Sequence, residues 1–183
     1  MAQKQKKMRS RIILVALVLI GFSSCEEVDK LTQFNMSFDN QITIPANTLI
    51  NIPVSLSTPD IATNSEATFA GKETNAASID EIKLQSLTLT IITPANSNFN
   101  FFKSVEVFIN SNGLPEAALG SNPNVADGIT TLNLTTTDAN IKDYITAESF
   151  SIRFSTTTDE TIGQDHEINI NTVFLIDAKV LGQ

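Results

Sequence analysis

The feature that most constrains the fold of this chain is an alternation of apolar and polar residues. In eight segments, apolar side chains recur at every second position, which is the spacing of a β-strand with one buried face. The eight segments are Phe34–Phe38, Gln41–Ile44, Thr48–Leu56, Ile82–Ile92, Phe101–Asn110, Ile129–Thr135, Ser149–Thr157 and Glu167–Val180. Eight strands bury their apolar faces economically when two antiparallel sheets pack together. We therefore predict an all-β domain over residues 34–183, an antiparallel β-sandwich of immunoglobulin-like or jelly-roll type, with a closed β-barrel as the alternative.

Composition supports short strands joined by polar loops. After residue 24, Ser, Thr and Asn together account for 51 of 159 residues. Thr is common in strands, whereas Ser and Asn favour turns. Two irregular stretches are expected: Ser57–Asp80, and the segment between Asn110 and Ile129, where Gly and Pro residues gather.

The alternation changes phase within Ile82–Ile92. The apolar residues before Gln85 share one face of the strand, while those after Ser86 share the other. One extra residue in an antiparallel strand restores the phase. The pattern therefore predicts a β-bulge near Gln85 and Ser86.

One short helix is expected, over Thr137–Ile145. Asp138 is a suitable N-cap residue, since its carboxylate can accept from the first free backbone N–H groups. Ile141, Tyr144 and Ile145 follow at the spacing of one helix face. This stripe is expected to be buried against the sheets.

The N-terminus has a separate pattern that is typical of a signal peptide. Five basic residues lie before position 12, and an uninterrupted apolar run, Ile12–Phe22, follows them. As a helix this run would span about 16 Å, against roughly 30 Å for the hydrocarbon core of a bilayer. The run is therefore too short for a permanent transmembrane helix.

The residues after the apolar run, Phe22-Ser23-Ser24-Cys25, resemble the lipobox of bacterial lipoproteins, with Phe22 where Leu is usual. The resemblance implies that residues 1–24 are a lipoprotein signal peptide and that Cys25 carries covalent lipid after cleavage. Residues 25–33 would then form a short acidic tether. The alternative is an ordinary secretory signal followed by Cys25 as a small buried side chain.

Three acidic residues lie beside the anchor: Glu26, Glu27 and Asp29. This cluster is similar to the export signal of lipoproteins from Bacteroidota. The resemblance implies an outer-membrane lipoprotein that faces the cell surface. A solvated tether with a periplasm-facing anchor is the alternative. Two or three acyl chains would hold the protein on its membrane stably, because stable anchoring needs more than one chain.

Charge and rare residues exclude several classes of protein. After residue 24, seven basic residues remain beside all twenty acidic ones, a net charge of −13. Such a chain is a poor partner for nucleic acid, whose phosphates need cations. One Cys and one His leave no disulfide framework and no zinc cluster.

The densest polar cluster suggests a cation site as a hypothesis. It holds four carboxylates around the single histidine, His166, and these are Asp159, Glu160, Asp165 and Glu167. Calcium takes six to eight oxygen ligands, but the spacing matches no EF-hand loop. A solvated loop that protects a sheet edge is the preferred interpretation.

The sequence does not indicate an enzyme. A Ser-His-Asp arrangement would have to use His166, which is expected in a loop, and no Gly-x-Ser-x-Gly motif occurs. A glycosidase needs only two carboxylates, so a small glycan hydrolase stays as an alternative. No cofactor is expected beyond the covalent lipid and a possible calcium ion.

Two strands carry apolar side chains on their nominal outer faces. Phe102 and Phe108 alternate with the apolar row of their strand, and Val173 and Leu175 do so in the last strand. Either Ser57–Asp80 or the turn Thr137–Ile145 packs over these side chains, or they form an exposed patch for a partner. For the two Phe residues we expect that irregular segments of the chain cover them.

The preferred functional prediction is a lipid-anchored, non-catalytic accessory module of the cell envelope. Its partners would be the membrane, through the lipid, and other outer-membrane proteins or glycans, as the lipoprotein resemblance implies. A carbohydrate-binding module with a calcium-assisted loop is the alternative.

Overall fold

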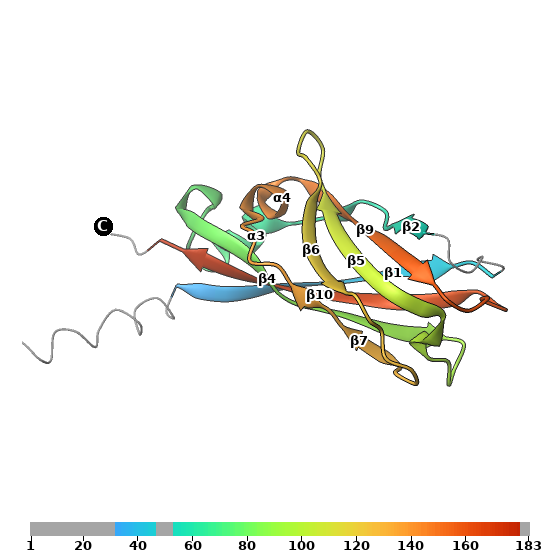
Figure 1. Cartoon of the computed structure of the whole chain (residues 1–183). Coiled ribbons are helices and arrows are strands. Elements are labelled where there is room, and N and C mark those ends of the chain that lie inside the picture. Colours follow the sequence, from blue (N-terminus) through green and yellow to red (C-terminus); the bar gives the residue numbers. More distant parts are fainter. Residues whose placement is uncertain (1–31, 47–52, 180–183) are drawn as a thin grey trace, which may run out of the picture. The chain divides into compact units, whose positions relative to one another are not determined.

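The computed structural model describes residues 32–46 and 53–179, and residues 34–179 form one compact unit (Figure 1). The strands are β1 (Gln33–Ile44), β2 (Pro53–Ser57), β3 (Ile61–Ala62), β4 (Ile79–Thr93), β5 (Phe102–Asn110), β6 (Ala117–Asn122), β7 (Thr131–Asn133), β8 (Thr135–Thr136), β9 (Ser149–Thr158) and β10 (His166–Ala178). The helices are α3 (Ser65–Ala70) and α4 (Lys142–Thr146), with 3-10 turns η2 (Ala76–Ser78) and η3 (Phe99–Phe101).

The strands form two antiparallel sheets. One has the order β1-β10-β4-β7 and the other β2-β9-β5-β6-β8, with β3 also paired to β9. The prediction of an all-β sandwich is confirmed. The closed-barrel alternative is wrong for the described residues, because their strands divide between two separate hydrogen-bonded sheets.

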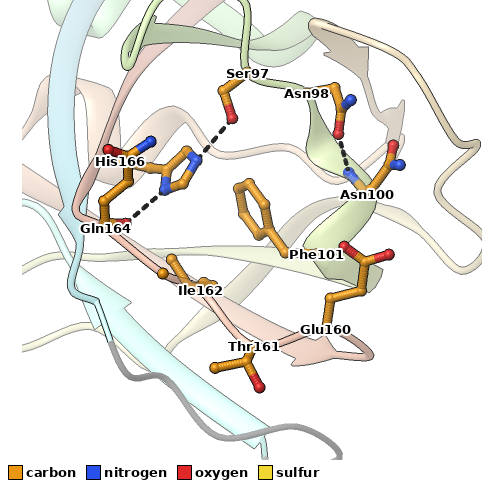
Figure 2. Close-up of a pocket in the computed structure, with 10 residues that line it drawn as sticks. Ser97, Asn98, Asn100, Phe101, Glu160, Thr161, Ile162, Gln164 and His166 are labelled. Atoms are coloured by element: carbon orange, nitrogen blue, oxygen red, sulfur yellow. Dashed lines mark hydrogen bonds between the residues drawn. The ribbon is translucent and has the colours of Figure 1, made fainter.

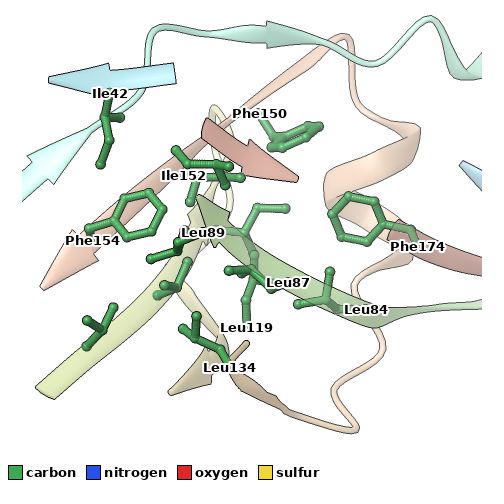
Figure 3. Close-up of a cluster of buried hydrophobic side chains, with 14 of the residues drawn as sticks. Ile42, Leu84, Leu87, Leu89, Leu119, Leu134, Phe150, Ile152, Phe154 and Phe174 are labelled. Carbon is green, nitrogen blue, oxygen red and sulfur yellow. The ribbon is translucent and has the colours of Figure 1, made fainter. Parts of the chain in front are cut away.

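Alternation along the long strands builds the core between the sheets. In β10, Ile168, Ile170, Phe174 and Ile176 are fully buried, while the residues between them are polar or half-exposed. Figure 3 shows Leu84, Leu87 and Leu89 of β4 among Phe150, Ile152 and Phe154 of β9. Burial of each such side chain contributes about 1.5–3 kcal/mol, which is why the alternation fixes which face of each strand turns inward.

The predicted bulge in β4 is confirmed. Ser86 pairs with Val173 and Leu84 pairs with Phe174, so Gln85 is the extra residue. The extra residue brings Leu84 and Leu87 to the same face, where they are 4% and 1% exposed. A second register shift leaves Asp80 as the extra residue between Ile79 and Glu81.

The prediction of a loop between Asn110 and Ile129 is wrong for the middle of this segment, which forms strand β6. The strand reads Ala-Ala-Leu-Gly-Ser-Asn, which has little β propensity, and pairing with β5 and β8 determines its conformation instead. Gly120 is needed there, because a Cβ at this position would lie 2.7 Å from the carbonyl oxygen of Thr135.

Other boundaries also differ from the prediction. The first two predicted strands are one continuous strand, β1, and the expected irregular stretch Ser57–Asp80 contains β3 and α3. Part of the predicted strand Thr48–Leu56 lies outside the described residues, where β2 begins at Pro53. The predicted strand Ile129–Thr135 divides into β7 and β8, which belong to different sheets.

Helix α4 begins later than predicted, and Asp138 does not cap it. Its N-cap residue is Ile141, whose backbone N–H donates to the carbonyl oxygen of Ile82 at 2.8 Å. Asn140 Oδ1 accepts from Lys142 N at 3.1 Å and takes the role expected of Asp138. The predicted stripe is confirmed, since Ile141, Tyr144 and Ile145 are buried. Within residues 32–46 and 53–179, no helix is long and apolar enough to cross a membrane.

Candidate functional site

A pocket of about 400 Å³ lies where the loop after β4 meets the loop between β9 and β10. Figure 2 shows its lining, with the Phe101 ring in the middle and polar side chains around it. The lining residues are Ser97, Asn98, Asn100, Phe101, Glu160, Thr161, Ile162, Gly163, Gln164 and His166. Polar residues from two distant segments therefore surround one aromatic ring, and we call this the Phe101 pocket.

Side-chain amides hold the first loop in place. Asn98 Oδ1 accepts from the backbone N–H of Asn100 at 3.1 Å and so caps the turn η3. Asn100 Oδ1 accepts from the backbone N–H of Gly128 at 2.6 Å. Because both amide oxygens serve backbone donors, the Nδ2 groups carry most of the remaining hydrogen-bonding capacity of Asn98 and Asn100, and they are donors.

His166 is buried at one side of the pocket, where it is the first residue of β10. Its Nδ1 lies 2.9 Å from the carbonyl oxygen of Gln164, which can only accept, so Nδ1 carries a proton. In the neutral ring Nε2 then accepts from the hydroxyl of Ser97, at 2.7 Å. The residue is 6% exposed, and its ring centroid lies 4.7 Å from that of Phe101. The expectation that His166 lies in a loop is wrong, because β10 extends to it.

The Ser97–His166–Gln164 chain has the order of a nucleophile, a base and an orienting group. Its third member is a backbone carbonyl, which is uncharged and stabilises an imidazolium less than a carboxylate does. Glu160 lies across the Phe101 ring from the imidazole in Figure 2. The arrangement is therefore best explained as hydrogen bonding that satisfies a buried histidine.

The structure does not bring the four candidate metal ligands together. Asp165 Oδ1 accepts from the backbone N–H of Ala46 at 2.7 Å, and Glu167 Oε2 accepts from Thr93 Oγ1 at 3.4 Å. Of these four candidates, only Glu160 lines the pocket, and Asp159 lies outside it. Among the residues that the structure describes, no three Asp, Glu, His or Cys side chains are placed to hold a metal ion.

The prediction that Phe102 lies on the outer face of β5 is wrong. A register shift between Phe102 and Ser104 turns Phe102 toward the core, where it is 4% exposed. Its ring stacks on Phe99 at 5.8 Å and meets Phe101 edge-on at 4.6 Å between centroids. The turn that precedes the strand thus packs against Phe102, in place of the distant segments that we expected.

Phe108 does lie on the outer face of β5, where it is half-buried. The guanidinium of Arg153, on the neighbouring strand β9, lies 4.3 Å from its ring centroid. Arg153 also donates to both oxygens of Glu116, and its hydrogen bond lowers the pKa of that carboxyl group. A side chain on the next strand therefore covers Phe108, and not an irregular segment.

Val173 and Leu175 are half-buried on the outer face of β10. Since β10 and β5 belong to different sheets, these two residues and Phe108 lie on opposite outer faces of the sandwich. The four apolar residues proposed as a patch do not come together. Cys25, Glu26, Glu27 and Asp29 lie outside the described residues.

Sequence reasoning missed most of the Phe101 pocket. The run Asn96-Ser97-Asn98-Phe99-Asn100 has the composition of a turn, and that was the available signal. Nothing in the sequence pairs this run with a segment almost 70 residues later.

Comparisons with known proteins do not assign the chain to a family. No protein family model and no curated protein matches it. Among solved structures, the capsid of Helicobacter pylori bacteriophage KHP30 covers 78% of this chain and 92% of its own, at 8% identity and a TM-score of 0.36. The match to FLHE covers 79% of this chain and 97% of the FLHE chain, at 9% identity and a TM-score of 0.34. The match to Desmodium yellow mottle tymovirus covers 82% of this chain and 91% of the viral chain, at 12% identity and a TM-score of 0.29. All three TM-scores are below 0.5, so they carry no argument about function.

Proposed function

We propose that this protein is a lipid-anchored lipoprotein of the outer membrane, in which the β-sandwich is a non-catalytic binding or structural accessory module facing the cell surface. The observation that carries the proposal is the position of Cys25. It is the single Cys of the chain and directly follows a basic segment, an apolar run and two Ser residues. This order resembles the lipobox of bacterial lipoproteins.

The position of the domain along the chain supports a role close to the bilayer. Phe34, the first residue of the compact unit, follows Cys25 by nine residues. Even when fully extended, this segment would span at most roughly 30 Å. A partner of the sandwich would therefore have to be another envelope component or a ligand that reaches the membrane surface.

Fractionation of cells that produce the full chain tests the anchor. The wild-type protein should stay with the outer membrane after a high-salt wash, whereas Cys25→Ser should be released or accumulate as an uncleaved precursor. Ser24→Ala is the matched control, since it keeps a small residue before the cysteine, and it should stay anchored. Wild-type protein that fractionates as soluble would contradict the proposal.

Surface proteolysis tests the direction that the domain faces. Protease added to whole cells should cleave the wild-type protein. Replacement of Glu26, Glu27 and Asp29 by Ala should keep the anchor but protect the domain, because the export signal is lost. The charge-keeping variant Glu26→Asp with Glu27→Asp should stay accessible. Equal cleavage of all three forms would leave the anchor intact and overturn the export signal.

The non-catalytic part of the proposal concerns Ser97 and His166. A fluorophosphonate probe, which labels activated serine nucleophiles, should leave Ser97 unmodified, because its partner imidazole lacks a carboxylate. Labelling of Ser97 that disappears in His166→Ala would show a working nucleophile and contradict a purely binding role.

A further inference from the structure

We propose that the Phe101 pocket binds one neutral sugar residue through its hydroxyl groups. The inference rests on the proposed function as a binding module and names the ligand class of the site. It depends on the kinds of polar groups around the pocket, on their charge, and on the size of the space between them.

The pocket lining contains both hydrogen-bond donors and acceptors. Asn98 and Asn100 supply Nδ2 donors, since backbone N–H groups already occupy their oxygens. The Glu160 carboxylate is an acceptor, while the Thr161 hydroxyl and the Gln164 amide can both donate and accept. Glu160, Thr161 and Gln164 are exposed, so a ligand can reach them. A ligand hydroxyl also both donates and accepts, and it matches such a mixed set better than a group with one role.

The charge of the lining favours a neutral ligand over an anion or an amine. The lining contains one carboxylate and neither Lys nor Arg, so nothing in it would neutralise a phosphate, sulfate or carboxylate. An amine would pair with Glu160 but could not accept from the Nδ2 groups of Asn98 and Asn100. A neutral polyhydroxyl compound satisfies all of these groups.

The centre of the pocket is apolar, as a sugar ring requires. Phe101 lies between the Asn side chains on one side and His166 on the other (Figure 2). A pyranose presents C–H groups beside its hydroxyls and can place them against this ring while the hydroxyls reach the polar rim. Phe101 is only 6% exposed, so this apolar contact is small and the affinity should be modest.

Size limits the ligand to a single unit. A volume of about 400 Å³ is near the lower end of ligand pockets, which range over roughly 300–1,000 Å³. One monosaccharide, or one residue at the end of a glycan, is the appropriate occupant.

Gly163 offers a way to block the pocket without disturbing the fold. It lines the pocket, and a Cβ at this position would meet nothing within 4 Å. Its backbone lies outside the positive-φ region that favours glycine. Gly163→Trp should therefore add a bulky side chain to the lining of the pocket without a clash at its Cβ, while Gly163→Ala is a matched control that adds one methyl group.

The test is calorimetric titration of the full acylated chain with four probes: the methyl glycosides of glucose, galactose, mannose and N-acetylglucosamine. The chain is extracted in a detergent without a sugar headgroup, because such a headgroup would compete. At least one probe should bind, with a Kd on the order of 1 mM. Glu160→Gln should weaken binding by about tenfold, since it removes a charged acceptor. Gly163→Trp should abolish binding.

Two controls should bind as tightly as the wild type. Asp159→Asn changes the neighbouring exposed carboxylate, which does not line the pocket, and Gly163→Ala adds one methyl group. The melting temperatures of all variants should match the wild type, which separates loss of binding from loss of fold.

The inference is overturned if none of the four probes binds the wild-type chain, or if a probe binds equally well to Gly163→Trp. Its failure is distinct from failure of the proposed function. A chain that stays on the outer membrane but binds no probe overturns the sugar site alone. A chain that binds a probe through Glu160 but fractionates as soluble overturns the anchor alone.

Discussion

The β4–β10 pair and the Phe101 pocket are held together in opposite ways. The strand pair is fixed by apolar side chains that alternate along both strands, such as Leu87, Leu89 and Ile170, all nearly inaccessible to solvent. The pocket is fixed by single hydrogen bonds between distant polar groups, such as Ser97 with His166. A periodic pattern therefore determines the strand pair, whereas individual residues determine the pocket.

The largest expected effect comes from shifting the alternation in β4. Deletion of Lys83 would bring Ile82 next to Leu84 and turn one of them to the outer face, so the chain should lose cooperative unfolding. Deletion of Gln85 removes the bulge residue and leaves Leu84 and Leu87 in phase, so the chain should still unfold cooperatively, at a cost below about 3 kcal/mol. Urea unfolding of the chain from Glu26 onward measures both.

If the two variants unfold alike, the phase of the apolar residues does not determine the strand pair, and the bulge is an incidental feature.

A smaller effect is expected in the pocket, from His166→Leu. The variant leaves the Ser97 hydroxyl and the Gln164 carbonyl without their partner, which should cost about 1–3 kcal/mol. Gln164→Ala is the matched control, since it keeps the backbone carbonyl and removes only an exposed side chain, and it should change stability by less than about 0.5 kcal/mol. A His166→Leu cost as small as that of the control would show that these hydrogen bonds do not stabilise the pocket.

The smallest expected effect concerns Glu116, which lies just before β6 and pairs with Arg153 of β9. The Arg153 hydrogen bonds lower the pKa of the Glu116 carboxyl group below its usual value of 4.5. A carboxylate whose pKa is lower in the folded chain stabilises it above the unfolded pKa, and this contribution is lost as the pH falls through the folded pKa. Because the pair is partly exposed, we expect less than about 1 kcal/mol.

Glu116→Gln removes the ionisable group of this pair and so tests its pH-dependent contribution to stability. Below about pH 4.5 the wild type should lose more stability than the variant, so the two urea midpoints should converge as the pH falls. Parallel midpoints from pH 7 to pH 3 would show that the Arg153 pair contributes no pH-dependent stability.

The same contrast explains what could be predicted from the sequence. The faces of β10 and the bulge at Gln85 were predictable, because each apolar residue reports its own burial through a period of two. Strand β6 was not, since its Ala, Gly and Ser residues acquire strand structure only by pairing with β5 and β8. The inward turn of Phe102 was missed for a similar reason, because a register shift set by the partner strand left no mark in the sequence.

The candidate site was less predictable than the fold. Its two segments are joined by contacts such as that between Ser97, in the loop after β4, and His166, at the start of β10, which lie 69 residues apart and follow no period. The cluster Asp159–Glu167 was recognised as polar, but its carboxylates accept from different partners, including the backbone N–H of Ala46, 119 residues away and just after β1. Local composition predicted which segments are polar, but only the folded structure shows which polar side chains lie close together.

Intact-mass spectrometry of the native protein is the most direct test of the proposed lipid anchor at Cys25. Protein extracted from the outer membrane should have the mass of residues 25–183 plus a diacylglycerol and one further acyl chain, and its N-terminal peptide should carry that added mass at Cys25. A chain with the unmodified mass of its peptide and a free thiol at Cys25 would contradict the proposed anchor.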